Sequence, residues 1–173
     1  MKLSKIDYKD EYVVQKISST IKDIINENTV IVCIGTDRII GDSLGPLIGT
    51  ILERNKFKYP VYGTLEKPIH ALNIYESIEN IEKTHPNGIF LVIDACVGEK
   101  TSVGTIQIMK GPVSPGKGIG KKLPKIGHYS LLGIVDEKHE DRNFLFGSVR
   151  LNFIFDLAEI ISSSLLASTL IEK

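Results

Sequence analysis

Two aspartates, each placed after an apolar run, are the residues of this chain with the clearest capacity for chemistry. Asp94 directly follows the most apolar run, residues 89–93, and Asp42 lies in the loop after a β-branched run at residues 29–34. Both runs predict buried strands. Because ligands and catalysis gather at the carboxyl ends of parallel strands, these carboxylates form a candidate acid/base pair or metal site. An enzyme is therefore the first expectation.

Each aspartate has a catalytic and a structural interpretation. If Asp42 and Asp94 approach one another, like charges sharing a site raise the pKa of one of them. One carboxyl then holds a proton and polarises a peptide carbonyl, while the other activates water. Alternatively, Asp42 caps a helix that opens at Ser43, and Asp94 accepts hydrogen bonds from loop amides. Capping and catalysis are compatible for Asp42.

Glu66 and His70 are the predicted supporting residues. They follow the second expected strand and lie four residues apart, so they face one direction if Pro68 starts a helix. At that edge of the sheet they would contact substrate or a metal. The equally weighted alternative is a carboxylate at a helix start and an exposed histidine.

A glycine-rich segment at residues 115–120 is the second candidate for substrate contact. It reads Pro-Gly-Lys-Gly-Ile-Gly and lacks the spacing of a phosphate-binding loop. We expect a substrate-binding flap that uses Gly116 and Gly118, or else a surface loop without a role.

The elements that would position these residues alternate between strands and helices. Strands are expected at residues 29–34, 59–63, 89–93 and 105–109, with the third of them central. Helices are expected at residues 11–25, 43–54, 68–83, 129–135 and 148–170. A long loop at 110–127 and a solvated turn at 136–142 separate the later elements. This order predicts one α/β domain over residues 1–173, with three αβα layers and a mostly parallel sheet.

Composition and charge limit the classes of binding partner and the cellular location that we expect. Lysine plus arginine and aspartate plus glutamate each number 21, so the formal net charge of zero provides no footprint for nucleic acid. Cys33 and Cys96 lie in or beside expected strands, which favours reduced thiols over a disulfide framework. The N-terminus lacks the apolar core of a signal peptide, and the apolar run at 160–171 is shorter than a membrane span. A cytoplasmic protein without a membrane partner is expected.

Several motifs of this chain resemble the YyaC-type family of sporulation proteins. The resemblance extends from Thr29 to about Val135 and is carried by residues 35–38 (Gly-Thr-Asp-Arg), 41–46 (Gly-Asp-Ser-Leu-Gly-Pro), 63–73 and 93–96 (Ile-Asp-Ala-Cys).

A more distant likeness is to the germination protease of spore-forming bacteria. The shared features, in the same order, are an aspartate before Leu-Gly-Pro (Asp42), an Ile-Asp-Ala after a central strand (Asp94), and a Thr-Ile-Gln-Ile strand followed by the glycine-rich segment. The resemblance implies a phosphorylase/hydrolase-like fold and a catalytic pair of Asp42 and Asp94. It also implies a peptidase of sporulation or germination that acts on small acid-soluble spore proteins in the forespore or spore core.

The hydrogenase-maturation endopeptidases are similar in outline. They bind a metal through acidic residues after core strands and a later histidine. By that resemblance a divalent metal would be held by Asp42, Asp94 and His128. A protein that keeps the fold but binds a peptide or metal without cleaving is the remaining alternative.

Overall fold

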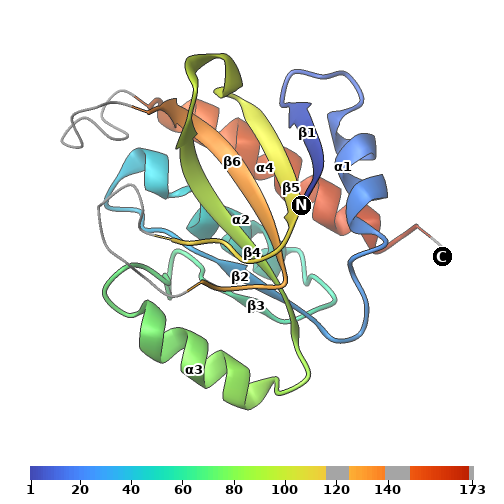
Figure 1. Cartoon of the computed structure of the whole chain (residues 1–173), viewed down its shortest axis with the longest axis vertical. Coiled ribbons are helices and arrows are strands. Elements are labelled where there is room, and N and C mark those ends of the chain that lie inside the picture. Colours follow the sequence, from blue (N-terminus) through green and yellow to red (C-terminus); the bar gives the residue numbers. More distant parts are fainter. Residues whose placement is uncertain (116–124, 139–148, 172–173) are drawn as a thin grey trace.

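A sheet with the strand order β1-β5-β6-β4-β2-β3 forms the centre of the molecule in a computed structural model of the chain (Figure 1). The structure describes residues 1–115, 125–138 and 149–171. Strands β2, β3, β4 and β6 run parallel, and β5 and β1 complete the sheet in antiparallel pairs. The strands are β1 (Lys2–Asp7), β2 (Thr29–Cys33), β3 (Val61–Tyr62), β4 (Ile89–Gly98), β5 (Thr105–Lys110) and β6 (Tyr129–Glu137).

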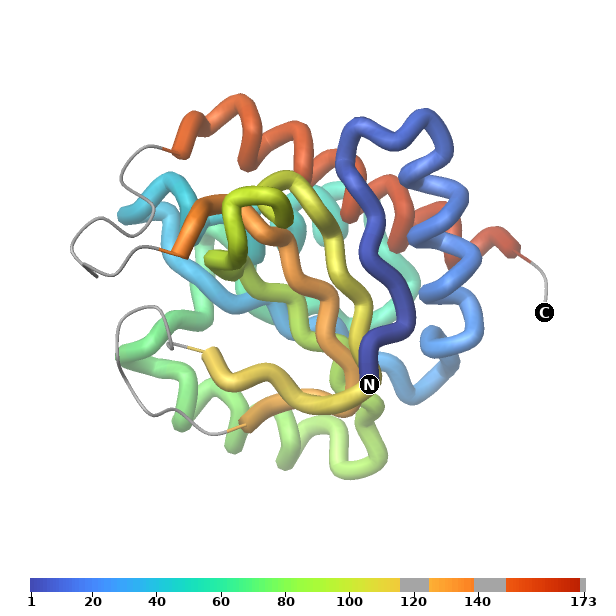
Figure 2. The backbone as a smooth tube through the Cα atoms, turned by 45° about the horizontal axis from the view of Figure 1, so that its top comes forward, coloured from blue at the N-terminus to red at the C-terminus, as the bar shows by residue number. Residues whose placement is uncertain are grey.

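Helices cover both faces of this sheet, which confirms the predicted three-layer α/β architecture (Figure 2). On one face, α1 (Val13–Ile21), α2 (Leu44–Arg54) and α4 (Leu151–Ser168) share a core cluster with the sheet. On the other face, α3 (Ile74–Thr84) contributes to a second cluster.

Strand β4 lies between β6 and β2, as expected for the central strand. Its side chains alternate between the two cores, with Leu91 and Ile93 in the α1–α2–α4 cluster and Phe90 and Val92 in the α3 cluster. A strand buried on both faces needs apolar side chains at successive positions, which explains the unbroken run before Asp94.

The helix predicted at residues 129–135 is wrong, because this segment forms β6. Leu131 pairs with both Ile93 of β4 and Ile108 of β5, so the segment is held from both sides. At Gly133 an added Cβ would lie 2.4 Å from Leu44 Cδ2, so α2 packs directly on the strand. A short apolar run has the same pattern in a buried strand and a buried helix. The predicted turn at 136–142 is also wrong at its start, since Asp136 is buried in β6.

Strand β1 was not predicted from the sequence. It pairs antiparallel with β5 at an edge of the sheet, and Ile6 is its buried residue. Apart from Leu3, which is exposed, the other positions of β1 are polar or charged, which is typical of an edge strand and leaves little apolar signal in the sequence.

The predicted helix at 68–83 begins six residues late, at Ile74. The preceding segment is a turn closed by Asn73, whose Oδ1 accepts from the backbone N–H of His70 (2.8 Å) and whose Nδ2 donates to the carbonyl of Pro68 (2.9 Å). Ile69 instead forms an isolated parallel bridge with Ile34. The turn thereby carries the chain past the end of β2 before α3 starts.

Helix α4 is long and apolar enough to cross a membrane by length and composition alone. A buried core helix meets the same criteria. Its residues Ile154, Leu157, Ile161 and Leu165 are fully buried in the α1–α2–α4 cluster, which is the packing of a core helix.

Candidate active site

Asp94 occupies the carboxyl-terminal half of β4 and is 7 % exposed. It is paired in register with Leu132 of β6, and on the other side Ile34 donates its backbone N–H to the carbonyl of Ile93 (2.8 Å). By the alternation along β4, the Asp94 side chain lies on the α3 face of the sheet, with Val92. A carboxyl group is thus built into the central strand.

Asp42 ends a short 3-10 turn, η1 (Ile40–Asp42), that contacts β4 and α4. The backbone N–H of Thr36 is shared between Asp42 Oδ2 and the Asp42 carbonyl, each at 3.1 Å. Gly35 allows this closure, since its φ is +141° and an added Cβ would lie 2.0 Å from the Asp42 carbonyl oxygen.

The alternative role of Asp42 as a helix cap is not observed. Helix α2 begins at Leu44, and its N-cap residue Ser43 makes no capping hydrogen bond with its side chain. The Ser43 hydroxyl donates instead to the carbonyl of Ile40 (2.7 Å), while Asp42 turns back to Thr36.

Both carboxyl groups have a raised pKa, and the charge of Asp42 contributes to the shift of Asp94. Burial raises the pKa of Asp42 to about 6, against the opposing effect of the Thr36 N–H. The pKa of Asp94 is raised well above its ordinary value by burial first and then by the negative charge of Asp42, with the N–H of Ala95 opposing. Each carboxyl therefore keeps its proton to a higher pH than an ordinary aspartate does, and a charge on Asp42 disfavours a second charge on Asp94. The sequence predicted a pair of this kind, and its catalytic role stays a prediction.

His70 lies toward the same carboxyl-terminal end of the parallel strands as Asp94. Gly35 donates its N–H to the carbonyl of Ile69 (2.8 Å), so His70 follows the residue that bridges to Ile34. Two strand spacings separate the Ile69 and Asp94 backbones, roughly 10 Å. The His70 ring accepts at Nδ1 from the N–H of Leu72 (3.3 Å).

Glu66 is exposed and does not line the groove in which His70 lies. The helix that would have aligned Glu66 with His70 is absent at these positions. Gly116 and Gly118 lie outside the described residues. On either side of them, Val113 and Ile126 form an antiparallel bridge and pack in the α3 cluster with Leu132.

His128 lies away from the aspartates, which corrects the predicted set of three metal ligands. Its Nδ1 accepts from the backbone N–H of Phe90 (3.0 Å), and its own N–H donates to the Phe90 carbonyl (2.9 Å). Phe90 precedes Asp94 by four strand positions, roughly 13 Å. In the part of the chain that the structure describes, no three His, Cys, Asp or Glu side chains gather to hold a metal.

Cys33 is fully buried, and burial raises the pKa of its thiol, so it has the packing role expected from the sequence. Cys96, two residues after Asp94, is half-buried and free of a disulfide.

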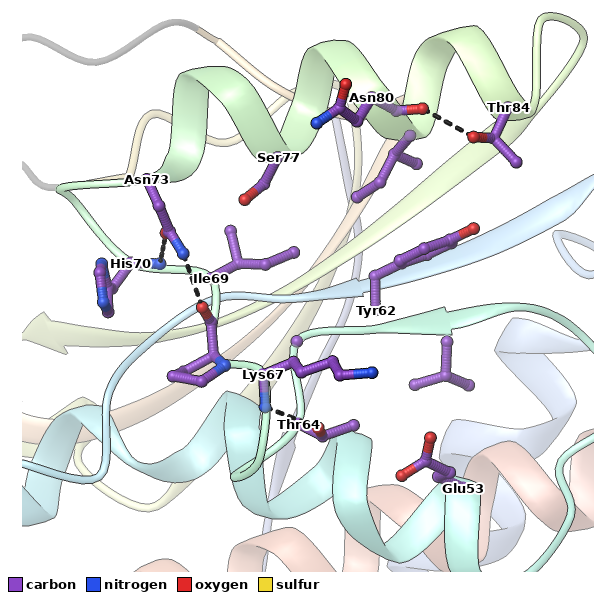
Figure 3. Close-up of a pocket in the computed structure, with 14 residues that line it drawn as sticks. Glu53, Tyr62, Thr64, Lys67, Ile69, His70, Asn73, Ser77, Asn80 and Thr84 are labelled. Atoms are coloured by element: carbon purple, nitrogen blue, oxygen red, sulfur yellow. Dashed lines mark hydrogen bonds between the residues drawn. The ribbon is translucent and has the colours of Figure 1, made fainter.

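A groove of about 640 Å³ between β3 and α3 was not predicted (Figure 3). His70 lies at one end of it, and Tyr62 donates to or accepts from His85 Nε2 (2.8 Å) near the other. A signal was present in the sequence, because uncharged polar residues recur on one face of α3 at helical spacing. The lining residues of α3 are Ser77, Asn80, Ile81 and Thr84, and Asn73 lies directly before the helix.

The fold and these residues define a class: a three-layer α/β protein with one aspartate, Asp94, in the carboxyl-terminal half of its central strand and a second, Asp42, whose charge raises the pKa of the first. The chain belongs to the family described as "Protein of unknown function (DUF1256)", whose model matches residues 5–164. It is similar to the "Uncharacterized protein YyaC" of Bacillus subtilis (strain 168), with 40% identity over 150 residues that cover 86% of this chain and 73% of that protein. The resemblance to the YyaC-type family is thus confirmed. Neither description includes an activity.

Proposed function

We propose that this protein is an endopeptidase in which Asp42 and Asp94 form the catalytic acid/base pair. One observation carries the proposal: a buried carboxyl on the central strand, Asp94, whose pKa is raised both by burial and by the charge of Asp42. Structural aspartates more often gain partners that lower their pKa. Two neighbouring carboxyl groups whose pKa values are raised are instead suited to proton transfer.

The two carboxyls have different tasks near neutral pH. Asp42, with a pKa of about 6, is mostly ionised there and takes a proton from a water molecule. The water oxygen attacks the carbonyl carbon of the peptide bond, while Asp94 gives its proton to the carbonyl oxygen. When the tetrahedral intermediate collapses, that proton returns to Asp94, and Asp42 passes its proton to the leaving amine.

The surrounding backbone supports this division of tasks. The Thr36 N–H holds one oxygen of Asp42 and favours its ionised form. Asp94 lies deeper and retains its proton more strongly. Burial also limits bulk water, which strengthens the electrostatic interactions of both groups.

The biological setting is part of the same proposal. The ordered motifs around Asp42, Asp94 and the strand at residues 105–108, which resemble the germination protease, support a role in sporulation or germination. They favour small acid-soluble spore proteins as substrates and the forespore or spore core as the location.

The test is mass spectrometry of small acid-soluble spore proteins incubated with the purified protein. We expect discrete cleavage by the wild-type chain and by Asp37→Asn, which alters an exposed carboxyl of the same loop. Cleavage should be lost in Asp94→Asn and in Asp42→Asn. Intact substrate with the wild-type chain, or cleavage that survives in Asp94→Asn, contradicts the proposal.

A further inference from the structure

The groove between β3 and α3 follows the edge of the sheet (Figure 3). β3 is the last strand in the sheet order, so within the described structure it has a strand neighbour only on the β2 side. Val61 packs with the α1–α2–α4 cluster and Tyr62 with the α3 cluster, yet both line the groove. Residues on opposite faces share one groove only if it runs along the strand edge.

The backbone of β3 presents hydrogen-bonding groups to this groove. Ile31 donates its N–H to the Pro60 carbonyl (2.9 Å), so that carbonyl points toward β2. Backbone groups alternate in direction along a strand, and the N–H and carbonyl of Val61 therefore point away from β2. An extended chain in the groove would pair with them as an added strand.

The opposite wall of the groove suits a peptide backbone. Ser77 of α3 points into the groove, Asn80 lines it one turn further along the helix, and Asn73 and Thr84 line the two ends (Figure 3). Amide and hydroxyl side chains both donate and accept hydrogen bonds, as peptide groups do. The charged residues of the lining, Glu53 and Lys67, are of opposite sign, so the groove has no strong preference for a charged ligand.

Neither aspartate lines the groove, but its lining includes Ile69 and His70, which follow the end of β2 next to the central strand. The 11 residues of α3 are roughly 16 Å long, the reach of about five residues of extended chain. At the His70 end, about three more residues span the two strand spacings to Asp94. A segment of about eight residues would therefore fill the groove and place one bond at the pair.

We propose that the substrate binds as an extended, flexible polypeptide segment that adds to the edge of β3 and is held from the other side by α3. The inference rests on the proposed peptidase function, because it uses the aspartates as the end point of the segment. It assigns Ser77 and Asn80 as contacts that hold the substrate backbone and contribute to affinity for any extended segment.

The test measures peptide binding apart from turnover. A decapeptide selected from a random display library against the Asp94→Asn protein is labelled with fluorescein, and its Kd is measured by anisotropy. In that background, Ser77→Phe fills the groove and should weaken binding by about tenfold or more. Glu76→Phe places the same ring on the adjacent, exposed position outside the groove lining and should change Kd less than about twofold.

A second variant guards against a folding defect. Asn80 is exposed, so Asn80→Ala should keep the fold and still weaken binding about fivefold through a lost hydrogen bond. The amide resonance of Val61 should shift on peptide binding in a nitrogen-15 spectrum. Equal Kd values for Ser77→Phe, Asn80→Ala and Glu76→Phe, or failure to select any peptide, overturn the groove proposal.

The outcomes for the two proposals are separable. If the selected peptide binds in the groove but the wild-type chain leaves it and the spore proteins intact, the peptidase function fails and the groove proposal stands. If the wild-type chain cleaves the spore proteins and Ser77→Phe cleaves them equally well, the groove proposal fails and the peptidase function stands.

Discussion

Asp94 and Asp42 place negative charge where the fold disfavours it, and this affects both chemistry and stability. Asp94 sits on a strand whose preceding residues are all apolar, and its charge is opposed by burial and by Asp42. A protein that retains such a pair gives up stability for a site with tuned proton affinity.

The pair predicts a bell-shaped dependence of kcat/KM on pH. Activity should rise as pH increases through about 6, because Asp42 must be ionised to act as the base. It should fall at higher pH, where Asp94 loses the proton that it gives to the carbonyl oxygen. Measurement of kcat/KM with a fluorogenic peptide across this range checks both limbs. A rate that is flat through pH 6 would show that Asp42 is not the base.

Replacing Asp94 with asparagine should stabilise the folded chain near neutral pH. Because the folded-state pKa of Asp94 lies above its ordinary value of 3.8, the unfolded chain ionises first as pH rises, and the free energy of unfolding falls. Asp94→Asn removes this loss, with an expected gain on the order of 1 kcal/mol near pH 7. The gain should vanish near pH 3, where Asp94 is protonated in both states. Urea unfolding at both pH values measures it, and a less stable variant near pH 7 would contradict the expectation.

Among the elements, the turn from Gly35 to Asp42 controls where the second carboxyl lies. The turn is closed by the hydrogen bond from the Thr36 N–H to Asp42. At its start, the N–H of Gly35 donates to the carbonyl of Ile69. The same turn therefore links Asp42 to the segment that carries His70.

Gly35→Ala should disrupt this turn and the site together. An added Cβ would lie 2.0 Å from the Asp42 carbonyl oxygen, at a φ of +141° that alanine rarely adopts. We expect kcat/KM to fall at least about tenfold and the free energy of unfolding to fall by about 1–3 kcal/mol. Gly111→Ala is the matched control, since its φ of +125° carries a similar backbone cost but nothing lies within 4 Å of its Cβ. If both variants lost activity equally, the geometry of the turn at Gly35 would have no specific role in catalysis.

His128 lies away from Asp42 and Asp94, so the acid/base proposal and a metal-dependent mechanism predict different results for a His128 variant and for a chelator. The His128 side chain accepts a hydrogen bond from Phe90, near the start of β4 and away from the aspartates. His128→Ala should therefore leave kcat/KM within about twofold. Under the acid/base proposal a chelator should have equally little effect. Activity that a chelator abolishes and a divalent ion restores would favour the metal-dependent endopeptidase, with Asp42 and Asp94 as ligands. Metal analysis of the purified protein is the accompanying measurement.

For the whole molecule, the two faces of the sheet are covered unequally. Among the described residues, α1, α2 and α4 share one face (Figure 2), whereas α3 packs on the other, in a cluster that also contains Val113 and Ile126. The groove lies along the lateral edge of the sheet, between α3 and the short edge strand β3. Substrate access on the α3 side also agrees with the direction of the Asp94 side chain.

The sequence alone determined the buried strands β2 and β4 and the position of Asp42 in the loop after β2, but it ended the central strand before Asp94, whereas β4 continues to Gly98. Both strands were predictable because a strand covered on both faces must be apolar at successive positions, a pattern that is visible without any partner. It did not determine β6, whose apolar run is equally compatible with a helix, nor β1, whose edge position hides its signal.

Only the tertiary structure decided which of the candidate residues meet. The pKa of Asp94 depends on a carboxyl 52 positions earlier in the chain. His128 lies far from Asp94 because it is hydrogen-bonded to Phe90, near the start of β4. The groove arises because β3 is an edge and α3 begins only at Ile74. Strand order and register fix these relationships, and both are set by packing between segments that are distant in sequence.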